Sequence, residues 1–421
     1  MKMMIIGSGG REHALAWKCA QSPKIQKIYC CPGNGGTATL EKAENIDISD
    51  YQKMADFAKE EGVELVMVGP EAPLVEGISD IFQKERIPII GPVKEAAMLE
   101  GSKAFAKEFM KKYNVATADY IITDSYDKAM DFVRTANYPL VIKADGLAAG
   151  KGVRIIDNRQ DAERTIKEYM IEKIFGDAGT KIVIEEYLTG IEASILSITD
   201  GSTIIPFISA QDHKPIGEGN TGDNTGGMGV IAPNPAVDKK VMADFTENIM
   251  KPTLEGIKKE GWDFRGIIFF GIMITKKGAK LLEYNVRFGD PETQALLPML
   301  KTDLIDILTA CWEKKLHTIE LQWNAQHSCC VVAASGGYPG SYKKGYPIEG
   351  LEKTKNTIFI AGAKKEGEKL ITSGGRVLAV CATGSTREEA RKKAYSDMQK
   401  IHFTDIYYRK DIGTILPKTS Q

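Results

Sequence analysis

Short apolar runs alternate with amphipathic segments over the first hundred residues of the chain. The apolar runs are 3–6, 25–29, 65–68 and 87–90, and Gly or Pro follows most of them. The segments between them, 11–20, 51–61 and 74–84, carry apolar residues at helical spacing. This alternation predicts parallel βαβ units, whose functional loops lie at the carboxyl ends of the strands.

The pattern changes after about residue 103, where predicted strands follow one another closely. Runs 140–144 and 152–156 form one group, and runs 182–187, 193–199 and 203–207 form another. Close succession is typical of hairpins in antiparallel sheets, so we predict an α+β region here. The polar segment 209–229, with six glycines, has no candidate core, and we expect a functional or disordered loop.

The remaining chain predicts a second half of this region and a further unit. A helix at 238–260 precedes two strongly apolar strands, 266–275 and 280–286. After Trp323, strands at 328–334 and 377–382 and a helix at 387–401 indicate another unit. We therefore predict a multidomain protein of three units, the first α/β and the others α+β.

Composition and charge narrow the class of protein. The 421 residues are 43% hydrophobic and 26% charged, which is typical of a globular chain with sizeable cores. The net charge of -1 provides no global field that would attract nucleic acid or an anionic membrane. The seven cysteines have neither disulfide nor zinc-finger spacing, and we find no signal peptide. Because the most apolar stretch, 266–275, is too short to span a bilayer, we expect a cytoplasmic protein.

A glycine turn follows the first predicted strand, at Gly7-Ser8-Gly9-Gly10-Arg11. A strand that enters such a turn and opens a helix presents free backbone N–H groups to an anion. Glu12 replaces the third glycine of the dinucleotide fingerprint, and no convincing ribose-binding acid follows at the usual spacing. We interpret Gly9, Gly10 and Arg11 as a phosphate cradle; the alternative is a tight turn that binds nothing.

Gly146, Gly150 and Gly152 form a second glycine-rich loop, flanked by Lys143 and Lys151. It is not a Walker A loop, because its glycine spacing is too short and Gly152 replaces the Ser/Thr that would hold magnesium. Since the loop lies between two predicted strands, we interpret it as a flap over phosphates whose charge the lysines neutralise. An ordinary mobile turn is the alternative.

Glu185 and Glu186 are embedded in an apolar strand that continues into Tyr187 and Leu188. A carboxylate here could bind a ribose hydroxyl, and the backbone of an extended segment could pair with an adenine edge. By itself, however, this strand favours a simpler interpretation, in which one of its faces is solvated.

The segment 281–292 gives the most specific signal. Period-two geometry places Glu283, Asn285 and Arg287 on one face and apolar side chains on the other. Magnesium takes oxygen ligands, which Glu283 and Asn285 offer, and Arg287 can pair with a carboxylate or phosphate in a bidentate manner. Burying these polar groups without partners would be costly, so we favour a site over a structural role.

Further polar residues could contact a substrate. Glu71, after Pro70, could bind a hydroxyl or amine or only occupy the first turn of a helix. Asp212 and Lys214 are candidate substrate contacts in the polar segment, whereas His213 is better explained as a solvated loop residue than as an acid or base. No serine or cysteine nucleophile has a recognised setting, which argues against covalent enzyme intermediates.

Together these residues resemble the phosphoribosylamine–glycine ligase family of the ATP-grasp superfamily. The resemblance covers essentially the whole chain. Its motifs are IIGSGGREHALAWK at 5–18, GPEAPLVEGI at 69–78, LEGSKAFAKEFM at 99–110, VIKADGLAAGKGV at 141–153, IEEYLTGIEAS at 184–194, SAQDHKPIGEGNTGDNTGGMG at 209–229, EYNVRFGDPETQ at 283–294, GGRVLAV at 374–380 and YRKDIG at 408–413.

The resemblance implies a fold and a division into domains. We expect a Rossmann-like domain for the phosphoribosyl substrate at 1–102, with a parallel sheet. An ATP-grasp domain is expected at 103–325, with a mobile lid at about 118–190. A small α+β domain at 326–421, without obvious chemistry of its own, would pack against the others and enclose the substrate.

The resemblance also implies roles for individual residues. Lys103 and Lys143 would contact ATP phosphates beneath the flap, Glu185 to Leu188 would bind adenine, and Glu192 would bind the ribose. Glu283 and Asn285 would hold Mg²⁺ or Mn²⁺. Arg287, with Asp212 and Asp290, would order the reacting substrates, and the Gly9-Gly10-Arg11 turn would receive the sugar 5-phosphate.

The implied reaction is the ATP-dependent ligation of glycine to 5-phosphoribosylamine through glycyl phosphate. We expect a monomer whose partners are these small molecules and ATP, with no nucleic acid or membrane. Another ATP-grasp ligase or carboxylase of purine synthesis is the closest alternative. Two more distant alternatives remain. Glu12 and the metal strand disfavour a nicotinamide dehydrogenase, and the intact metal and phosphate residues disfavour a non-enzymatic nucleotide sensor.

Overall fold

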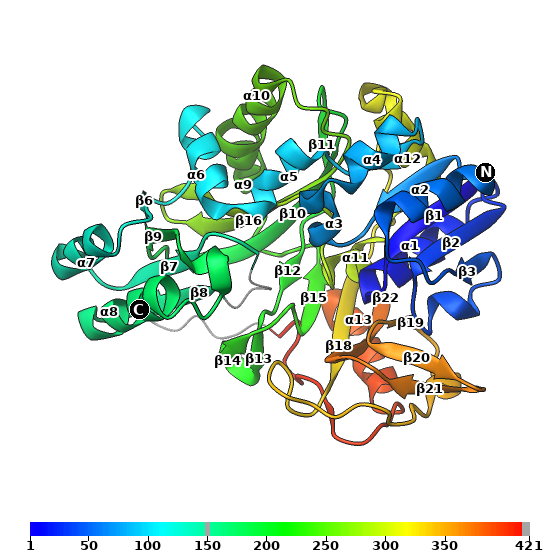
Figure 1. Cartoon of the computed structure of the whole chain (residues 1–421). Coiled ribbons are helices and arrows are strands. Elements are labelled where there is room, and N and C mark those ends of the chain that lie inside the picture. The colour runs from blue at the N-terminus through cyan, green and yellow to red at the C-terminus, as the bar shows by residue number, and fades with distance from the viewer. Residues whose placement is uncertain (148–151, 415–421) are drawn as a thin grey trace.

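The computed structural model describes residues 1–147 and 152–414, whose strands form several separate sheets (Figure 1). The N-terminal sheet has five strands in the order β3-β2-β1-β4-β5. They are parallel, as the alternation of apolar runs predicted, but β3 was not among the four predicted strands. Its elements are β1 Lys2–Gly7, α1 Gly10–Ala20, β2 Lys27–Pro32, β3 Ala43–Asn45, α2 Tyr51–Glu60, β4 Leu65–Val68, α3 Glu71–Glu76, α4 Ile78–Lys84, β5 Ile89–Ile90 and α5 Lys94–Gly101.

One predicted helix of this region is two helices. We expected a helix over 74–84, but the chain forms α3 and α4, which meet at Gly77. Gly77 has φ +99°, a left-handed conformation that ends a helix and that glycine adopts without steric cost. Apolar spacing could not reveal the break, because it continues across the glycine.

The central sheet is antiparallel and has the order β11-β10-β16-β17. Helices cover one of its faces, and the apolar residues of that face form a core shared with the N-terminal sheet. The elements are α6 Lys103–Lys112, β10 Ile191–Thr199, β11 Ile204–Pro206, α9 Lys239–Phe245, α10 Lys251–Glu260, β16 Gly266–Thr275, β17 Gly278–Asn285, α11 Glu292–Leu296 and α12 Leu304–Trp312.

A separate four-stranded antiparallel sheet, β6-β9-β7-β8, projects from the rest of the molecule with its own small core (Figure 1, left). Its elements are β6 Tyr120–Thr123, α7 Tyr126–Thr135, β7 Leu140–Ala144, β8 Val153–Ile156, α8 Arg159–Ile166 and β9 Ile182–Glu186. The predicted hairpin of β7 and β8 is confirmed. The predicted pairing of 182–187 with 193–199 is wrong, because β9 and β10 belong to different sheets.

The fourth sheet has the order β12-β15-β18-β22-β19, and β23 pairs with β18 at one end. The polar segment 209–229, which we expected to be a loop, contributes β12 and the small hairpin of β13 and β14. The elements are β12 Gln211–Asp212, β13 Pro215–Gly217, β14 Thr221–Asn224, β15 Gly229–Ala232, β18 His327–Ser335, β19 Thr357–Ile360, β20 Ala363–Glu366, β21 Lys369–Thr372, β22 Arg376–Gly384, α13 Arg387–Met398 and β23 Ile406–Tyr407.

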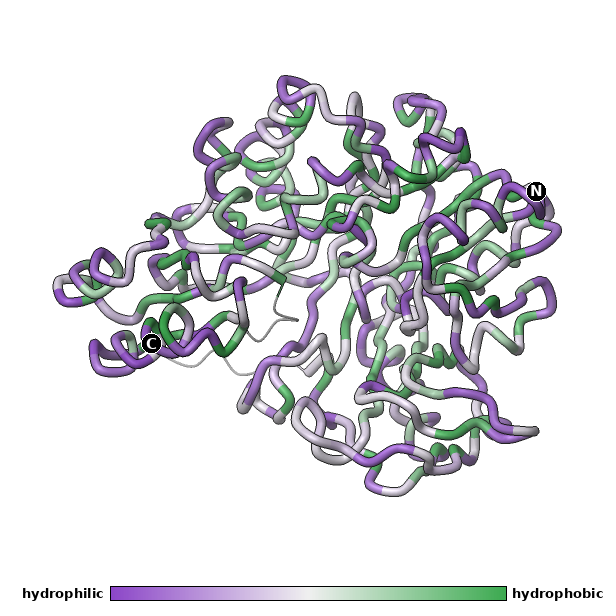
Figure 2. Tube along the Cα trace, viewed as in Figure 1, coloured by the Kyte–Doolittle hydropathy of each residue, from purple (hydrophilic) through white to green (hydrophobic). Residues whose placement is uncertain are grey.

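Apolar residues concentrate on the strands and on the helix faces that pack against the sheets (Figure 2). Several helices begin at a residue whose side chain accepts an N–H of the first turn, as at Ser102 and Thr386, which is the usual role of Ser and Thr at that position. All seven cysteines are buried and free, as predicted. Among the described residues, no helix is long and apolar enough to cross a membrane.

Candidate active site

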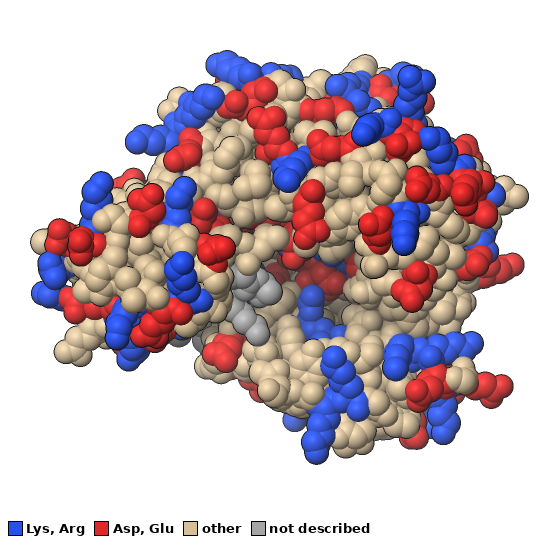
Figure 3. All heavy atoms as spheres, viewed as in Figure 1, with Lys and Arg blue, Asp and Glu red and all other residues tan. Residues whose placement is uncertain are grey.

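A cavity of about 2570 Å³ lies between the four sheets. The strand ends of the N-terminal sheet, one face of the central sheet, the inner face of the projecting sheet and the loops of the fourth sheet all line it. Acidic side chains gather in the hollow that is visible at the centre of the molecule (Figure 3). A cavity of this size can hold several reactants at once.

The register of the central sheet fixes the floor of this cavity. Ser194 on β10 pairs with Gly271 on β16, which in turn pairs with Glu283 on β17. Residues that pair across neighbouring strands point to the same face, so the Ser194 and Glu283 side chains both face the cavity. Gly271 has no side chain and therefore leaves open space between them.

Buried lysines and one carboxylate lie at the projecting-sheet end of the floor. Lys143 Nζ lies 2.9 Å from Glu185 Oε1, and Lys107 Nζ lies 3.3 Å from Glu185 Oε2. Lys107 and Glu185 are 2% and 3% exposed. Burial lowers the pKa of Lys107 to about 8, although the Glu185 carboxylate acts in the opposite direction. Glu185 thus holds two lysines at the cavity wall.

This geometry corrects one interpretation of the 182–188 strand. We considered a solvated face for it, and a carboxylate that binds ribose, but the Glu185 side chain is buried between lysines. The Glu186 carboxylate accepts the N–H of Asp119, 3.0 Å away. Glu186, Tyr187 and Leu188 nevertheless line the cavity, so their backbone groups are available to a planar ligand.

The base of the predicted flap is fixed to the start of α6. Asp145 Oδ1 accepts hydrogen bonds from Ser102 Oγ (2.8 Å) and from the N–H of Ala104 (2.7 Å). Lys103 Nζ donates to the carbonyl of Gly146 at 3.0 Å. Burial lowers the pKa of Lys103. Gly152 leads into β8, whereas Gly150 and Lys151 lie outside the described residues.

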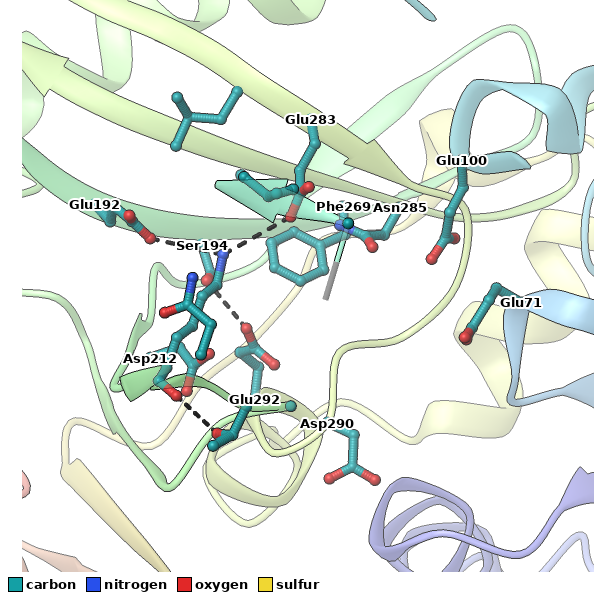
Figure 4. Close-up of a pocket in the computed structure, with 18 of the residues that line it drawn as sticks. Glu71, Glu100, Glu192, Ser194, Asp212, Phe269, Glu283, Asn285, Asp290 and Glu292 are labelled. Carbon is teal, nitrogen blue, oxygen red and sulfur yellow. Dashed lines mark hydrogen bonds and ion pairs between the residues drawn. The ribbon is translucent and has the colours of Figure 1, made fainter. Parts of the chain in front are cut away.

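Glu283 and Asn285 lie on the cavity face at the end of β17, as their spacing predicted (Figure 4). Lys214 Nζ is 3.7 Å from Glu283 Oε1 and 3.6 Å from Glu192 Oε2. Although burial alone would raise the pKa of Glu283, the positive charges of Lys214, Lys143 and Lys103 lower it, so this carboxylate is ionised. The described residues contain no cluster of three or more His, Cys, Asp or Glu that could hold a metal ion by themselves.

Arg287 lies just beyond β17 and is held by carboxylates of the N-terminal sheet region. Its Nη2 lies 2.9 Å from Glu100 Oε1, and its Nε lies 3.3 Å from Glu71 Oε2. Nη2 also donates to Asn285 Oδ1 at 3.0 Å. Burial raises the pKa of Glu100. Sequence reasoning found Glu71 but missed Glu100, which lies in α5 and stands in the quoted motif LEGSKAFAKEFM.

The glycine turn differs from the prediction. The N–H of Gly9 donates to Glu12 Oε2, and the N–H of Arg11 donates to Asp290 Oδ2 at 3.1 Å. The Arg11 guanidinium donates to Glu12 Oε1 (2.6 Å) and to the carbonyl of Phe288 (2.9 Å). The expectation of free N–H groups is therefore wrong for Gly9 and Arg11, whose N–H groups bind the chain's own carboxylates. The turn still lines the cavity, as does Pro70.

Arg376, at the start of β22, brings the fourth sheet into the site. Its Nη1 donates to the carbonyls of Asp290 and Gly226, both at 2.7 Å, and lies 3.3 Å from Asp290 Oδ1. Burial alone would raise the pKa of Asp290, but Arg376 and Arg11 beside it lower it. We assigned the C-terminal unit no chemistry, yet Arg376 stands in its quoted motif GGRVLAV and faces the cavity.

Asp212 and Glu292 lie beside each other at the Ser194 side of the floor (Figure 4). Ser194 Oγ donates to Glu292 Oε1 at 3.1 Å, and Glu292 is 3% exposed. Burial, followed by the negative charge of Glu292, raises the pKa of Asp212 well above its usual range. Sequence reasoning missed Glu292 and Ser194, although both stand in quoted motifs.

His213 corrects another expectation. We considered it a solvated loop residue, but it is buried, and its Nδ1 lies 3.1 Å from the carbonyl of Gly229. Its Nε2 accepts the N–H of Gly413 at 3.4 Å. Burial lowers the pKa of His213 to about 4, which keeps the ring neutral. The side chain therefore ties the polar segment to the C-terminal part of the chain.

All residues that line the cavity fall within matches to known protein families. Residues 1–100 match the N domain of phosphoribosylglycinamide synthetase, residues 101–293 match its ATP-grasp (A) domain, and residues 328–415 match its C domain. The three matches follow one another along the chain.

Individual proteins agree with the family matches. A phosphoribosylamine–glycine ligase of Clostridium acetobutylicum is 54% identical over 413 residues, which are 98% of this chain and 99% of that protein. The crystal structure of a phosphoribosylamine–glycine ligase from Thermotoga maritima has a TM-score of 0.87 at 33% identity and covers 98% of this chain and 100% of its own. A biotin carboxylase of Campylobacter jejuni (TM-score 0.74, 15% identity, 98% and 94% covered) shows that the fold is shared more widely.

Proposed function

The chain belongs to the phosphoribosylglycinamide synthetase family, and we propose that it ligates glycine to 5-phosphoribosylamine in purine biosynthesis, forming ADP and phosphate. One observation supports this chemistry. Glu283, which could bind a metal ion, and Lys103 and Lys143, which could bind phosphate, line the same cavity as the open floor at Gly271. Such a cavity can hold ATP and an acceptor carboxylate within reach of each other.

The first half of the reaction activates glycine. An oxygen of the glycine carboxylate attacks the γ-phosphorus of ATP, and the bond to the bridging oxygen breaks with its electron pair going to ADP. Lys103 and Lys143 neutralise the phosphate charge, and Arg287 orients the glycine carboxylate. The product is glycyl phosphate.

The second half forms the amide. The amine nitrogen of phosphoribosylamine attacks the carbonyl carbon of glycyl phosphate, the bond from that carbon to the phosphate oxygen breaks, and phosphate leaves with the electron pair. Orientation of the two reactants can supply ~7–11 kcal/mol of the barrier reduction. The projecting sheet, as a lid, would keep water away from the acyl phosphate.

Two oxygen donors, Glu283 and Asn285, fit a divalent cation of the Mg²⁺ or Mn²⁺ type. Such ions share their coordination among few protein groups, phosphate oxygens and water, so two protein ligands suffice. The cation supplies charge neutralisation of the phosphates when bound. Ionised Glu283 and the amide oxygen of Asn285 are the groups that this chain contributes.

The adenosine part of ATP has candidate partners at the same end of the cavity. We assign the adenine to the backbone of Glu186, Tyr187 and Leu188, and the ribose to the exposed carboxylate of Glu192. Gly146 and Gly152 bound the flap above the phosphates. Glu185 contributes by fixing the lysines rather than by touching the nucleotide.

The sugar phosphate needs cationic or N–H groups that are not already used within the protein. Arg376 uses Nη1 for its contacts with Asp290 and Gly226, which leaves Nη2 without a hydrogen-bond partner among the described residues. We therefore assign the 5-phosphate to Arg376. The Gly9-Gly10 turn forms the adjoining wall, and Asp290 connects the two by accepting hydrogen bonds from both sides.

Three further features complete the proposal. The domain boundaries at 102/103 and 325/326, with a lid at about 118–190, agree with the grouping of most strands into separate sheets. A cytoplasmic location agrees with seven free, buried cysteines. A monomer agrees with a cavity that one chain lines from all of its sheets.

The test is ADP release with phosphoribosylamine generated in situ, measured with and without glycine. We expect ADP only when glycine, phosphoribosylamine and a divalent cation are all present. ADP release that depends on bicarbonate instead of glycine would replace the proposal with a carboxylase. ADP release that needs neither acceptor would show that the chain is not this ligase.

A further inference from the structure

The end of the floor away from Lys107 and Lys143 carries the carboxylates of Asp212 and Glu292, to which the two steps proposed above assign no proton transfer; the resemblance implied only that Asp212 orders the reacting substrates. Asp212 ends β12 and Glu292 begins α11, so they come from distant parts of the chain. A Cβ added to Gly227 would lie 2.6 Å from Asp212 Oδ1 and 2.5 Å from Pro291 Cδ, which shows how closely the two segments approach. Both side chains line the cavity.

These two carboxylates lie where the second half of the reaction takes place. Glu292 is fixed to Ser194, and Ser194 stands in register with Gly271 and Glu283. Because neighbouring strands are about 4.8 Å apart, Ser194 and Glu283 are separated by roughly 10 Å across the glycine. An acyl phosphate bound at Glu283 would extend over Gly271 toward the carboxylates.

Asp212 Oδ1 is buried and has no hydrogen-bond partner among the described residues. A buried acceptor without a partner is costly, so this oxygen is suited to a donor that arrives with the substrate. Burial, and then the negative charge of Glu292, raise the pKa of Asp212. Lys214 and Arg376 are the cations that face the pair.

We propose that Asp212 and Glu292 act as one proton-accepting pair for the amine of phosphoribosylamine. The amine nitrogen forms its bond to the glycyl carbonyl carbon while phosphate leaves with the electron pair of the breaking C–O bond. The nitrogen then carries an excess proton, which passes to a carboxylate oxygen of this pair. Ser194 orients Glu292 for this transfer. The inference rests on the proposed function.

The experiment separates the two halves of the reaction by changing the nucleophile. Ligation is measured with phosphoribosylamine generated in situ, and activation is measured with hydroxylamine, a small nucleophile that traps glycyl phosphate as a hydroxamate. The variants are Glu292→Gln, which can still accept the hydrogen bond of Ser194, and Asp212→Asn. Asp223→Asn, an exposed carboxylate on β14 at the cavity rim, is the matched control.

We expect both variants to lower kcat for ligation by about 100-fold or more, the usual contribution of general acid–base catalysis. The fold-loss in hydroxamate formation should be at least ten times smaller than the fold-loss in ligation. The control should change neither rate. Equal losses in both assays, or unchanged ligation, would overturn the inference. Wild-type protein that shows no glycine-dependent ADP release would instead overturn the proposed function, so the two failures are distinguishable.

Discussion

At the scale of single residues, Glu185 determines how two lysines can coexist in the site. Lys107 and Lys143 both approach its carboxylate, and all three side chains are less than a tenth exposed. We expect Glu185→Gln to lower the free energy of unfolding by about 3–5 kcal/mol, because it leaves buried positive charges unpaired. Thermal unfolding without nucleotide measures the effect. Glu247→Gln, which removes an exposed pair with Lys251, should cost at most about 1 kcal/mol; equal effects would contradict the assignment.

Arg376 gives a second prediction at this scale. Arg376→Met removes the charged group that we assign to the sugar phosphate, and a charged hydrogen bond contributes roughly 1.5–3 kcal/mol. The KM for phosphoribosylamine should therefore rise about 10- to 100-fold, while the KM for ATP stays nearly constant. Steady-state kinetics with each substrate varied in turn measure both, and Arg376→Lys should recover part of the loss. A parallel rise in both KM values would show a structural role instead.

Residue types identified much of the site from the sequence alone. Glu283 and Asn285 alternate with buried apolar residues on β17, and Arg287 follows two residues after its end, so period-two geometry was sufficient to place them on one face. Glu100 and Glu292 could not be found in this way, since each lies in a helix and gains its role only through a contact distant in the chain. The occupied N–H of Arg11 in the glycine turn likewise depends on Asp290, far along the sequence.

At the scale of elements, the β1–α1 turn and the end of β4 pack against each other through Glu12. A Cβ at Gly69 would lie 1.8 Å from Glu12 Oε1, and Glu12 is fixed by Arg11 and by the N–H of Gly9. Gly69→Ala should therefore displace a buried ion pair. We expect a loss of stability of about 3 kcal/mol, at the upper end of the overpacking range, measured as a shift of the unfolding midpoint.

The matched control for this change is Gly62→Ala. Gly62 has φ +66° and no atom within 4 Å of an added Cβ, so the substitution costs only the left-handed backbone conformation, about 1–2 kcal/mol. If Gly69→Ala costs less than Gly62→Ala, the contact with Glu12 is not rigid and the turn can adjust.

Secondary structure was predictable where one pattern ran uninterrupted, as in β4, β7 and β16, whose bounds match the sequence prediction. The polar segment 209–229 was not, because its strands pair through backbone groups and carry few apolar residues. Pairing partners were also hidden. Adjacent β9 and β10 separate into two sheets because the partner of each strand comes from another part of the chain.

At the scale of the whole molecule, the parts that enclose the cavity are held together by buried contacts between the first and last units. His13 on α1 accepts the N–H of Ile360, at the end of β19, through Nδ1 at 2.8 Å. Its ring also packs edge-on against Phe359, with centroids 5.8 Å apart. The docking of the N-terminal sheet against the fourth sheet thus depends on a neutral imidazole.

Burial lowers the pKa of His13 to about 4, below its ordinary value of 6.5. Between these two values the unfolded chain binds more protons than the folded chain, so the contribution of His13 to stability is complete above pH 6.5 and is lost as the pH falls toward 4. The loss should reach about 3 kcal/mol.

His13→Asn keeps an acceptor near Nδ1 but does not titrate. The variant should be less stable at pH 7.5, because it leaves a small cavity, yet its unfolding midpoint should fall less steeply between pH 6.5 and 4 than that of the wild type. Parallel curves for the two proteins would mean that the acid sensitivity of this interface arises elsewhere.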